Sequence, residues 1–435
     1  MAKSFSRADL HAHSKYSDRP SEWVLRRIGA PESFTEPLDL YRRCRARGMD
    51  FVTISDHNRI EGALEIGHLP GVFVSNEVTT YFPEDGCKIH CLVLGITEAQ
   101  FREIEEARRS IYEFRDYLYD HDIVYSVAHP LFSVNDKLTV EHVERLLLLF
   151  KRFEGINGAR DPGGAELFQA IANSLTPRTM AKLADRHQID SRDPQPWRKH
   201  WTAGSDDHGG LYLASAWTAT PRVASVAEFL AQVRAGDTEL GGESGSSLRL
   251  AHSFYSISWA YYRAKLLRGA KSDLISDLFA RLVGDPEPES GSSISGPERL
   301  LQAAKLFIRP RPKRMGHSDR TLAESFERLT ALRGVEPTNA LDRRTFEEAC
   351  RMSQELTFTA LRKLIRHARR GRLTESLQTL SALGPLAVCI APYLAAFHTQ
   401  HKDERLLRAL GRQFPLPAAR ARGRRCAPTG PTRSR

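Results

Sequence analysis

Apolar positions in the first half of the chain follow two alternating periods. Up to about residue 235, short β-rich runs alternate with segments in which apolar residues recur at three- and four-residue steps. The runs expected as strands are "SRADLHA", "DFVTISD", "GVFVSNEV", "KIHCLVLG", "IVYSVAH", "RFEGIN" and "HWTAGSD". The expected helices are 36–47, 98–120, 139–151 and 164–187, the last with a break at Pro177. This alternation predicts a mostly parallel α/β sheet, and seven such strands indicate closure into a barrel. One connection differs, because "TTYFPEDGC" between the third and fourth runs suits a hairpin.

Beyond a Gly/Ser stretch at 240–247 the pattern is helical. A helical period covers 248–283, a Pro/Gly/Ser linker covers 284–298, and further helical segments follow at 298–307, 318–333, 342–370 and 373–383. The sequence therefore predicts a barrel domain over 1–240 and an all-helical region over 241–415. The run "PLAVCIAPYLAAF" is too short to cross a bilayer and is expected as a buried helix.

Composition narrows the class of protein. A chain of 435 residues with 41% hydrophobic residues is long enough for a large core and for two or three domains. No apolar window reaches the roughly 18 residues of a membrane span, and the N-terminus lacks the apolar core of a secretory signal. A cytoplasmic location is therefore expected. The six cysteines are scattered and are expected as reduced thiols. No pattern indicates an oligomeric state.

The net charge of +10 draws much of its excess from the C-terminal end. The last residues, "PLPAARARGRRCAPTGPTRSR", hold almost no large apolar side chains, so they cannot bury enough surface to offset the entropy of ordering. We expect a disordered basic tail over 416–435. It is either a solvated terminus or an arm that binds a polyanion such as nucleic acid.

Ligand-type side chains recur at the predicted strands, mostly at their ends. The first strand ends in "DLHAHSKYSD", and others end in "TISDHN", "SNEV", "VAHP" and "GSDDHGG". The carboxyl ends of parallel barrel strands open on one face, so these side chains are expected to converge there. The nine candidate metal ligands are His11, His13, Asp18, His57, Glu77, His90, His129, Asp206 and His208.

Nine ligands exceed the four that a single tetrahedral zinc requires. Neutral imidazole suits divalent zinc, manganese or iron, and a carboxylate can bridge two ions. We therefore expect two or three divalent ions that share Glu77. Ions about 3.5 to 4 Å apart lower the pKa of bound water toward about 7, hold it as hydroxide and neutralise charge on an attacked phosphate. This chemistry suits phosphoester hydrolysis.

These motifs, in this order and at these spacings over about residues 6–235, resemble the PHP (polymerase and histidinol phosphatase) superfamily. The resemblance implies a distorted seven-stranded (β/α) barrel with metal-dependent phosphoesterase activity. It also implies three metal sites. The first uses His11, His13, Glu77 and Asp206, the second uses Glu77, His90 and His129, and the third uses Asp18, His57 and His208. One departure is Arg19, which stands where the family usually has glycine.

Other polar residues are candidates for supporting roles. Asp9, Asp56 and Asp207 are placed to orient imidazoles, and Asp207 could instead protonate the leaving group. Arg160, just beyond the sixth strand, is the first candidate for phosphate binding. Arg19 and Arg59 follow it.

The favoured hypothesis is hydrolysis of a phosphate mono- or diester. The substrate would be a small phosphorylated metabolite, a nucleotide or an oligonucleotide end. One alternative is a scaffold barrel that serves the helical region or a partner, but such a barrel would be expected to have lost some ligands. Another is a metal-dependent C–N hydrolase, because an activated water also attacks carbonyls, although the lysine-bridged pattern of those barrels is missing.

Overall fold

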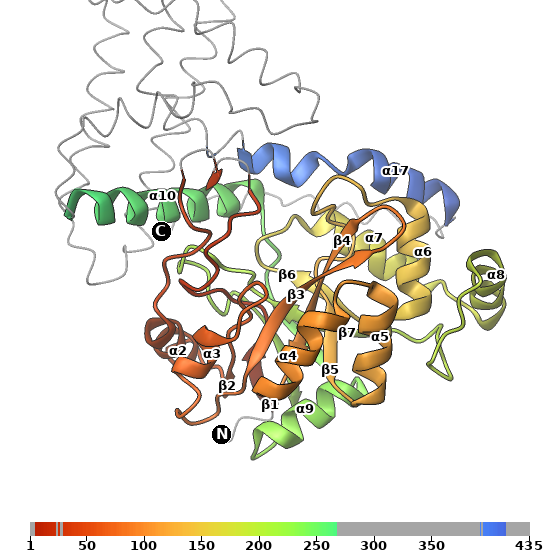
Figure 1. Ribbon diagram of the computed structural model, residues 1–435, viewed down its shortest axis with the longest axis horizontal. Helices are drawn as coiled ribbons and strands as arrows, with labels where there is room; N and C mark the ends of the chain where they lie inside the picture. Colours follow the sequence, from red (N-terminus) through yellow and green to blue (C-terminus); the bar gives the residue numbers. More distant parts are fainter. Residues whose placement is uncertain (1–4, 23–24, 27–28, 268–391, 393–394, 415–435) are drawn as a thin grey trace, which may run out of the picture.

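The computed structural model describes residues 5–22, 25–26, 29–267, 392 and 395–414. These residues form a mixed α/β unit with helices at its periphery (Figure 1). The expected linker at 284–298, most of the expected helical region and the basic tail lie outside the described residues.

All seven predicted strands are present, but they belong to two sheets. One sheet has the order β2 (Phe51–Val52), β1 (Phe5–Asp9), β8 (Ala216–Pro221) and β9 (Glu239–Gly242). The other has the order β3 (Ser75–Phe82), β4 (Cys87–Leu94), β5 (Val124–Val127), β6 (Arg152–Asn157) and β7 (His200–Gly204). The sequence pattern did not predict β8 and β9.

The closed seven-stranded barrel is not confirmed in the described part of the chain. Strand β2 has only two residues, and β1 pairs with β2 on one side and with the antiparallel β8 on the other. The edge strand β7 meets β8 through a side chain, since the Thr218 hydroxyl donates to Ala203 O and accepts from Ala203 N. Isolated parallel bridges, Ala12 with Asp207 and His57 with Glu77, join the two sheets beside the predicted ligands.

The predicted hairpin is confirmed. Strands β3 and β4 pair antiparallel from Ser75 opposite Leu94 to Phe82 opposite Cys87. Gly86 closes the turn with a φ of 72°, a conformation that glycine adopts without steric cost. Cys87 and Cys91 lie two pleats apart on β4 and are buried in the main core as free thiols.

The helices agree with the predicted segments, except that segment 98–120 contains a break that was not predicted. Segment 98–120 divides into α4 (Glu98–Ala107) and α5 (Ile111–Asp120). After the expected break, Pro177 is the first residue of α8 (Pro177–His187). Thr97, Thr139 and Ser225 each form a capping box at the start of a helix. The remaining helices of this part are α2 (Pro37–Ala46), α3 (Glu61–Glu65), α6 (Val140–Leu149), α7 (Pro162–Asn173), α8 (Pro177–His187) and α9 (Val226–Ala235).

Two C-terminal segments pack onto this unit. Helix α10 (Ser247–Leu267) and the stretch 395–414, which contains α17 (Glu404–Gln413), lie along the same side of it (Figure 1). Phe254 and Ile257 of α10 share a core with Leu25 and Ala395, while Leu410 joins the main core. Within the described residues, no helix has the length and apolar character needed to cross a membrane.

Candidate metal centre

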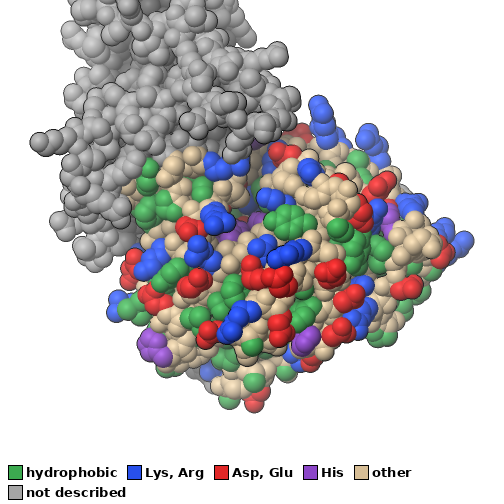
Figure 2. All heavy atoms as spheres, in the orientation of Figure 1, with side chains coloured by type: hydrophobic (Ala, Val, Ile, Leu, Met, Phe, Trp, Pro, Cys, Tyr) green, Lys and Arg blue, Asp and Glu red, His purple; other side chains and the backbone are tan. Residues whose placement is uncertain are grey.

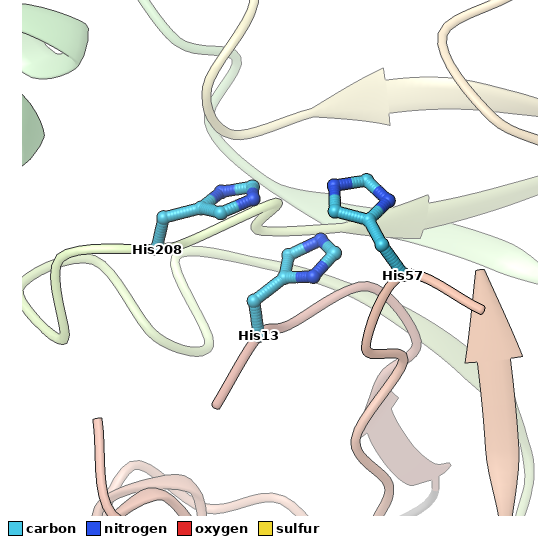
Figure 3. Close-up of side chains that lie close together, drawn as sticks. All are labelled: His13, His57 and His208. Atoms are coloured by element: carbon cyan, nitrogen blue, oxygen red, sulfur yellow. The ribbon is translucent and has the colours of Figure 1, made fainter. Parts of the chain in front are cut away.

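Eight of the nine predicted ligands converge on one buried cluster. Their ligand atoms form overlapping groups of three, and each group lies within 4.8 Å. Figure 3 shows three of these side chains, His13, His57 and His208, with their rings side by side. The rings of His13 and His208 stack with centroids 3.9 Å apart. The eight residues are His11, His13, His57, Glu77, His90, His129, Asp206 and His208.

Glu77 lies at the centre of the cluster. Its Oε2 is 3.2 Å from His11 Nε2 and 3.3 Å from His13 Nε2. Its Oε1 is 3.0 Å from His90 Nδ1 and 3.3 Å from His129 Nε2. Burial raises the pKa of Glu77, but the surrounding imidazoles lower it by more than burial raises it. The net pKa is therefore well below its usual value. Glu77 is therefore an ionised carboxylate, with Oε1 toward two histidines and Oε2 toward three, the third being His57 with Nδ1 at 3.0 Å.

Asp206 completes one side of the cluster. Its Oδ1 is 3.4 Å from His11 Nε2 and 3.5 Å from His13 Nε2. Burial raises the pKa of Asp206, but His11, His13 and Arg160 lower it more, so that the net pKa is well below its ordinary value. His11, His13, Glu77 and Asp206 together present two imidazoles and two carboxylates to one point.

The ligand atoms lack other partners. Within the described residues, Nε2 of His11, His13 and His208, Nδ1 of His57 and His90, and both Glu77 oxygens are buried without a hydrogen bond. Leaving so many buried polar atoms unpaired costs free energy unless another group satisfies them. The donor set of imidazole and carboxylate suits zinc, manganese or iron. The cluster is thus able to hold divalent metal ions.

The protonation states divide the histidines into two groups. Burial lowers the pKa of His57 and His129, and it lowers that of His208 to about 3, so these rings are neutral, as metal ligands must be. Burial also disfavours the charged forms of His11 and His13. The nearby carboxylates of Asp206 and Glu77 outweigh this effect and raise the pKa of His13 to about 9. At these two rings, protons would compete with a bound metal ion.

Asp18 does not join the cluster. Its side chain is 49% exposed and pairs with Arg59 at 3.0 Å. The place beside His57 and His208 belongs to Glu32, whose Oε2 is 3.4 Å from His57 Nε2 and whose Oε1 is 3.8 Å from His208 Nε2. Glu32 is buried, and its Oε1 also accepts hydrogen bonds from Ser21. Glu32 carries no signal in the strand-end pattern, because it lies in the loop between β1 and α2.

The backbone explains why Asp18 points outward. Ser17 is buried, and its hydroxyl donates to Asp56 and lies 3.1 Å from His13 Nδ1. The amide of Asp18 then donates to Tyr16 O in a tight turn. With Ser17 held inward, the next side chain faces solvent.

The predicted supporting aspartates divide by what they contact. Asp56 orients His13 through Ser17. Asp9 instead holds backbone, since it accepts from the amides of His11, Ser205 and Ala214. Glu154 in β6, which the strand-end pattern did not mark, contacts a candidate ligand directly. Its Oε1 is 2.9 Å from His11 Nδ1.

Asp207 lies behind the cluster. Its Oδ1 accepts from the amide of Tyr212, and its carboxylate interacts with Asp9 and Arg47. Burial raises the pKa of Asp207 to about 6. The side chain does not line the pocket above the ligands, so this position gives no support to the prediction that it protonates a leaving group. Arg59 pairs with Asp18 and Glu61, and Arg19 is exposed.

A pocket lined by His57, His90, His129, Asp206 and His208 of the cluster opens above it. Arg160 lines it, with Nε 3.7 Å from Asp206 Oδ2 and Nη1 3.6 Å from Glu22 Oε1. The guanidinium lies 3.7 Å from the centre of the Phe132 ring. Neither Nε nor Nη1 makes a hydrogen bond with the described residues. Leu250, Phe254 and Ile257 of α10 form part of the pocket wall.

The described residues carry charges of both signs on one face of the molecule. On the face shown in Figure 2, Lys and Arg side chains alternate with Asp and Glu side chains across the described residues. The positive charge of the sequence is not collected into one patch on this face.

Comparisons with known proteins give partial likenesses. No family profile matches the chain. An uncharacterised protein of Methanocaldococcus jannaschii is 37% identical over 67 residues, which are 15% of this chain and 37% of that protein. The crystal structure of a candidate metal-dependent phosphoesterase from Bifidobacterium adolescentis aligns with a TM-score of 0.27 and 16% identity, over 47% of this chain and 88% of its own. PsfC from Pseudomonas syringae aligns with a TM-score of 0.34 and 14% identity, over 61% of this chain and 100% of its own. None of these likenesses assigns the chain to a family.

Proposed function

We propose that this chain is a metal-dependent phosphoesterase that hydrolyses a phosphate mono- or diester, as the resemblance of its motifs to the PHP superfamily implies. One observation carries the proposal: buried ring nitrogens of five histidines and both oxygens of Glu77 lie in one cluster, and no described residue gives them a hydrogen bond. Such an arrangement is costly in a protein that does not bind metal.

The ligands fall into three sets. His11, His13, Glu77 and Asp206 would hold one ion, and Glu77, His90 and His129 a second. A third ion would lie near His57 and His208, with Glu32 rather than Asp18 as the acidic ligand. Zinc, manganese or iron held there would lower the pKa of water and neutralise phosphate charge.

The remaining groups bind and orient the substrate. Arg160 lines the pocket, where a planar guanidinium can contact two phosphate oxygens at once. The apolar side chains of α10 would contact the organic part of a small ester. Glu154 fixes the ring of His11, which keeps Nε2 directed at the metal position.

A substrate panel tests the proposal. The full chain is loaded with zinc, manganese or iron and assayed against p-nitrophenyl phosphate, its bis ester, nucleotides, sugar phosphates and 5′-phosphorylated oligonucleotides. We expect metal-dependent turnover of at least one ester, which Glu77→Ala abolishes together with bound metal. Glu105→Ala is the matched control, because Glu105 pairs with Arg108 on α4. Turnover of amides alone would favour the C–N hydrolase, and bound metal without turnover would favour the scaffold.

A further inference from the structure

The segment 395–403 contacts three loops at the rim of the pocket. Thr399 donates to Glu22 Oε2 at 2.8 Å, and Asp403 accepts from the amide of Ser133 at 2.9 Å. Lys402 donates to Ser133 O and lies 4.4 Å from the centre of the Phe132 ring. The loops that carry Glu22, Phe132 and Arg160 are thus all joined to a part of the chain more than 200 residues away.

Gln400 makes the contacts nearest to Arg160. Its Nε2 donates to Ala159 O at 2.7 Å, and its Oε1 accepts from the amide of Asp161 at 2.8 Å. One side chain therefore binds the backbone on both sides of Arg160. Asn157 also holds this turn, since its Oδ1 accepts from the amides of Ala159 and Arg160. Asn157 fixes the beginning of the turn, and Gln400 fixes its end.

The position of Arg160 needs such support. Its guanidinium lies between the carboxylates of Asp206 and Glu22 at distances longer than a hydrogen bond. A closer pairing with either carboxylate would take the arginine donors away from a bound phosphate. Thr399 holds Glu22, and Gln400 holds the backbone next to Arg160. The separation between the Glu22 carboxylate and the Arg160 guanidinium therefore depends on segment 395–403 at both residues.

We propose that Gln400 is a positioning residue that holds residues 159–161 so that Arg160 presents its guanidinium to the substrate phosphate. This inference rests on the proposed phosphoesterase function. It also gives the C-terminal segment a role in substrate binding that is separate from metal binding, because the side chains of Gln400 and Thr399 bond to Ala159, Asp161 and Glu22, none of which is a candidate metal ligand.

The test compares Gln400→Ala with Gln413→Ala in the full chain. Gln413 is a matched control, because it lies in the same C-terminal stretch but bonds to Glu144 of α6. We expect Gln400→Ala to raise KM for the phosphoester by about 10-fold, equivalent to about 1.4 kcal/mol, with a smaller change in kcat. The inhibition constant of inorganic phosphate should rise by a similar factor. Bound metal should be unchanged, and Gln413→Ala should match the parent.

A double variant shows whether Gln400 acts through Arg160. If it does, Arg160→Ala with Gln400→Ala should bind substrate no more weakly than Arg160→Ala alone. Gln400→Glu keeps the acceptor for the Asp161 amide but loses the donor to Ala159 O, and its KM should be intermediate. Additive effects in the double variant, or a KM of Gln400→Ala equal to that of Gln413→Ala, would overturn the inference.

Hydrogen exchange separates this inference from the proposed function, since it requires neither metal nor turnover. The Asp161 amide bonds to Gln400, so its exchange should be faster in Gln400→Ala than in the parent or in Gln413→Ala. If exchange is faster in Gln400→Ala but no ester is turned over, the contact between Gln400 and Asp161 is supported and the proposed phosphoesterase function is contradicted. If exchange of the Asp161 amide is unchanged in Gln400→Ala, the positioning role of Gln400 is contradicted even if the enzyme is active.

Discussion

Glu32 and Asp18 carry the same charge in opposite surroundings. Glu32 is buried beside His57 and His208, whereas Asp18 is about half exposed and pairs with Arg59. Glu32→Gln should therefore remove about one metal equivalent and lower turnover by roughly 100-fold. Asp18→Asn should leave both unchanged, because an exposed ion pair contributes little. Metal analysis by mass spectrometry distinguishes the two variants. If only Asp18→Asn loses metal, the acidic ligand of the third ion is Asp18 and not Glu32.

A buried carboxylate can also affect metal binding indirectly, by orienting a histidine that would bind the metal. Glu154 lies 2.9 Å from His11 Nδ1 and accepts from the His129 amide at 2.8 Å. Glu154→Gln keeps the shape but not the charge that orients the His11 ring, so metal affinity should fall by roughly 10- to 100-fold. Competition with a fluorescent chelator measures this change. An unchanged affinity would mean that packing alone orients His11.

At the level of elements, the site depends on how closely β7 approaches the end of β1. A Cβ at Gly204 would lie 2.3 Å from His11 Cβ and 2.6 Å from His11 N, and neither strand can move aside freely. Gly204→Ala should lower the free energy of unfolding by about 1 to 3 kcal/mol and weaken metal binding. Urea unfolding and metal titration measure the two effects.

Gly411 in α17 is the matched control for Gly204. An added Cβ there would meet no atom within 4 Å. Because glycine disfavours a helix interior, Gly411→Ala should raise stability by about 0.5 to 1 kcal/mol. Equal effects of the two substitutions would mean that the β1 and β7 approach is not a tight contact.

For the whole molecule, the predicted boundary at residue 240 falls within β9 (Glu239–Gly242), and later segments cover the same unit. A chain that ends at residue 245 retains the metal ligands but loses the partners of Leu25 on α10, together with Leu410 from the main core. Each large side chain so uncovered costs about 1.5 to 3 kcal/mol. We expect a lower Tm than for a chain that ends at residue 414, measured by calorimetry. Equal Tm values would make residues 1–245 an independent domain.

The basic tail gives a prediction at the same scale. Arginines that contact nucleic acid release counterions, so their affinity falls steeply as salt rises. If the tail is a polyanion-binding arm, removing 416–435 should weaken binding of a DNA duplex and flatten its salt dependence, while metal content stays the same. Fluorescence anisotropy across a salt series measures this effect. Unchanged binding would make the tail a solvated terminus.

The sequence by itself determined the elements and most of the cluster. Strand and helix periods arise from local burial, so all seven strands, the hairpin and the break at Pro177 were predictable. The convergence of eight of the nine candidate ligands was predictable, because imidazoles and carboxylates at strand ends in an α/β fold lie on one side. The prediction of Arg160 beside the pocket has the same origin.

Only the tertiary structure decided which polar side chains point inward. Glu32 lies in a loop, Glu154 lies within a strand and Gln400 lies in a distant helical segment, and no local period marks any of them. The expected closure into a barrel was not confirmed, because the sheets are divided by the pairing of β1 with β8, a strand that the pattern did not reveal. Local periods report burial along one element, whereas the direction of a loop side chain depends on contacts made by residues far apart in the chain.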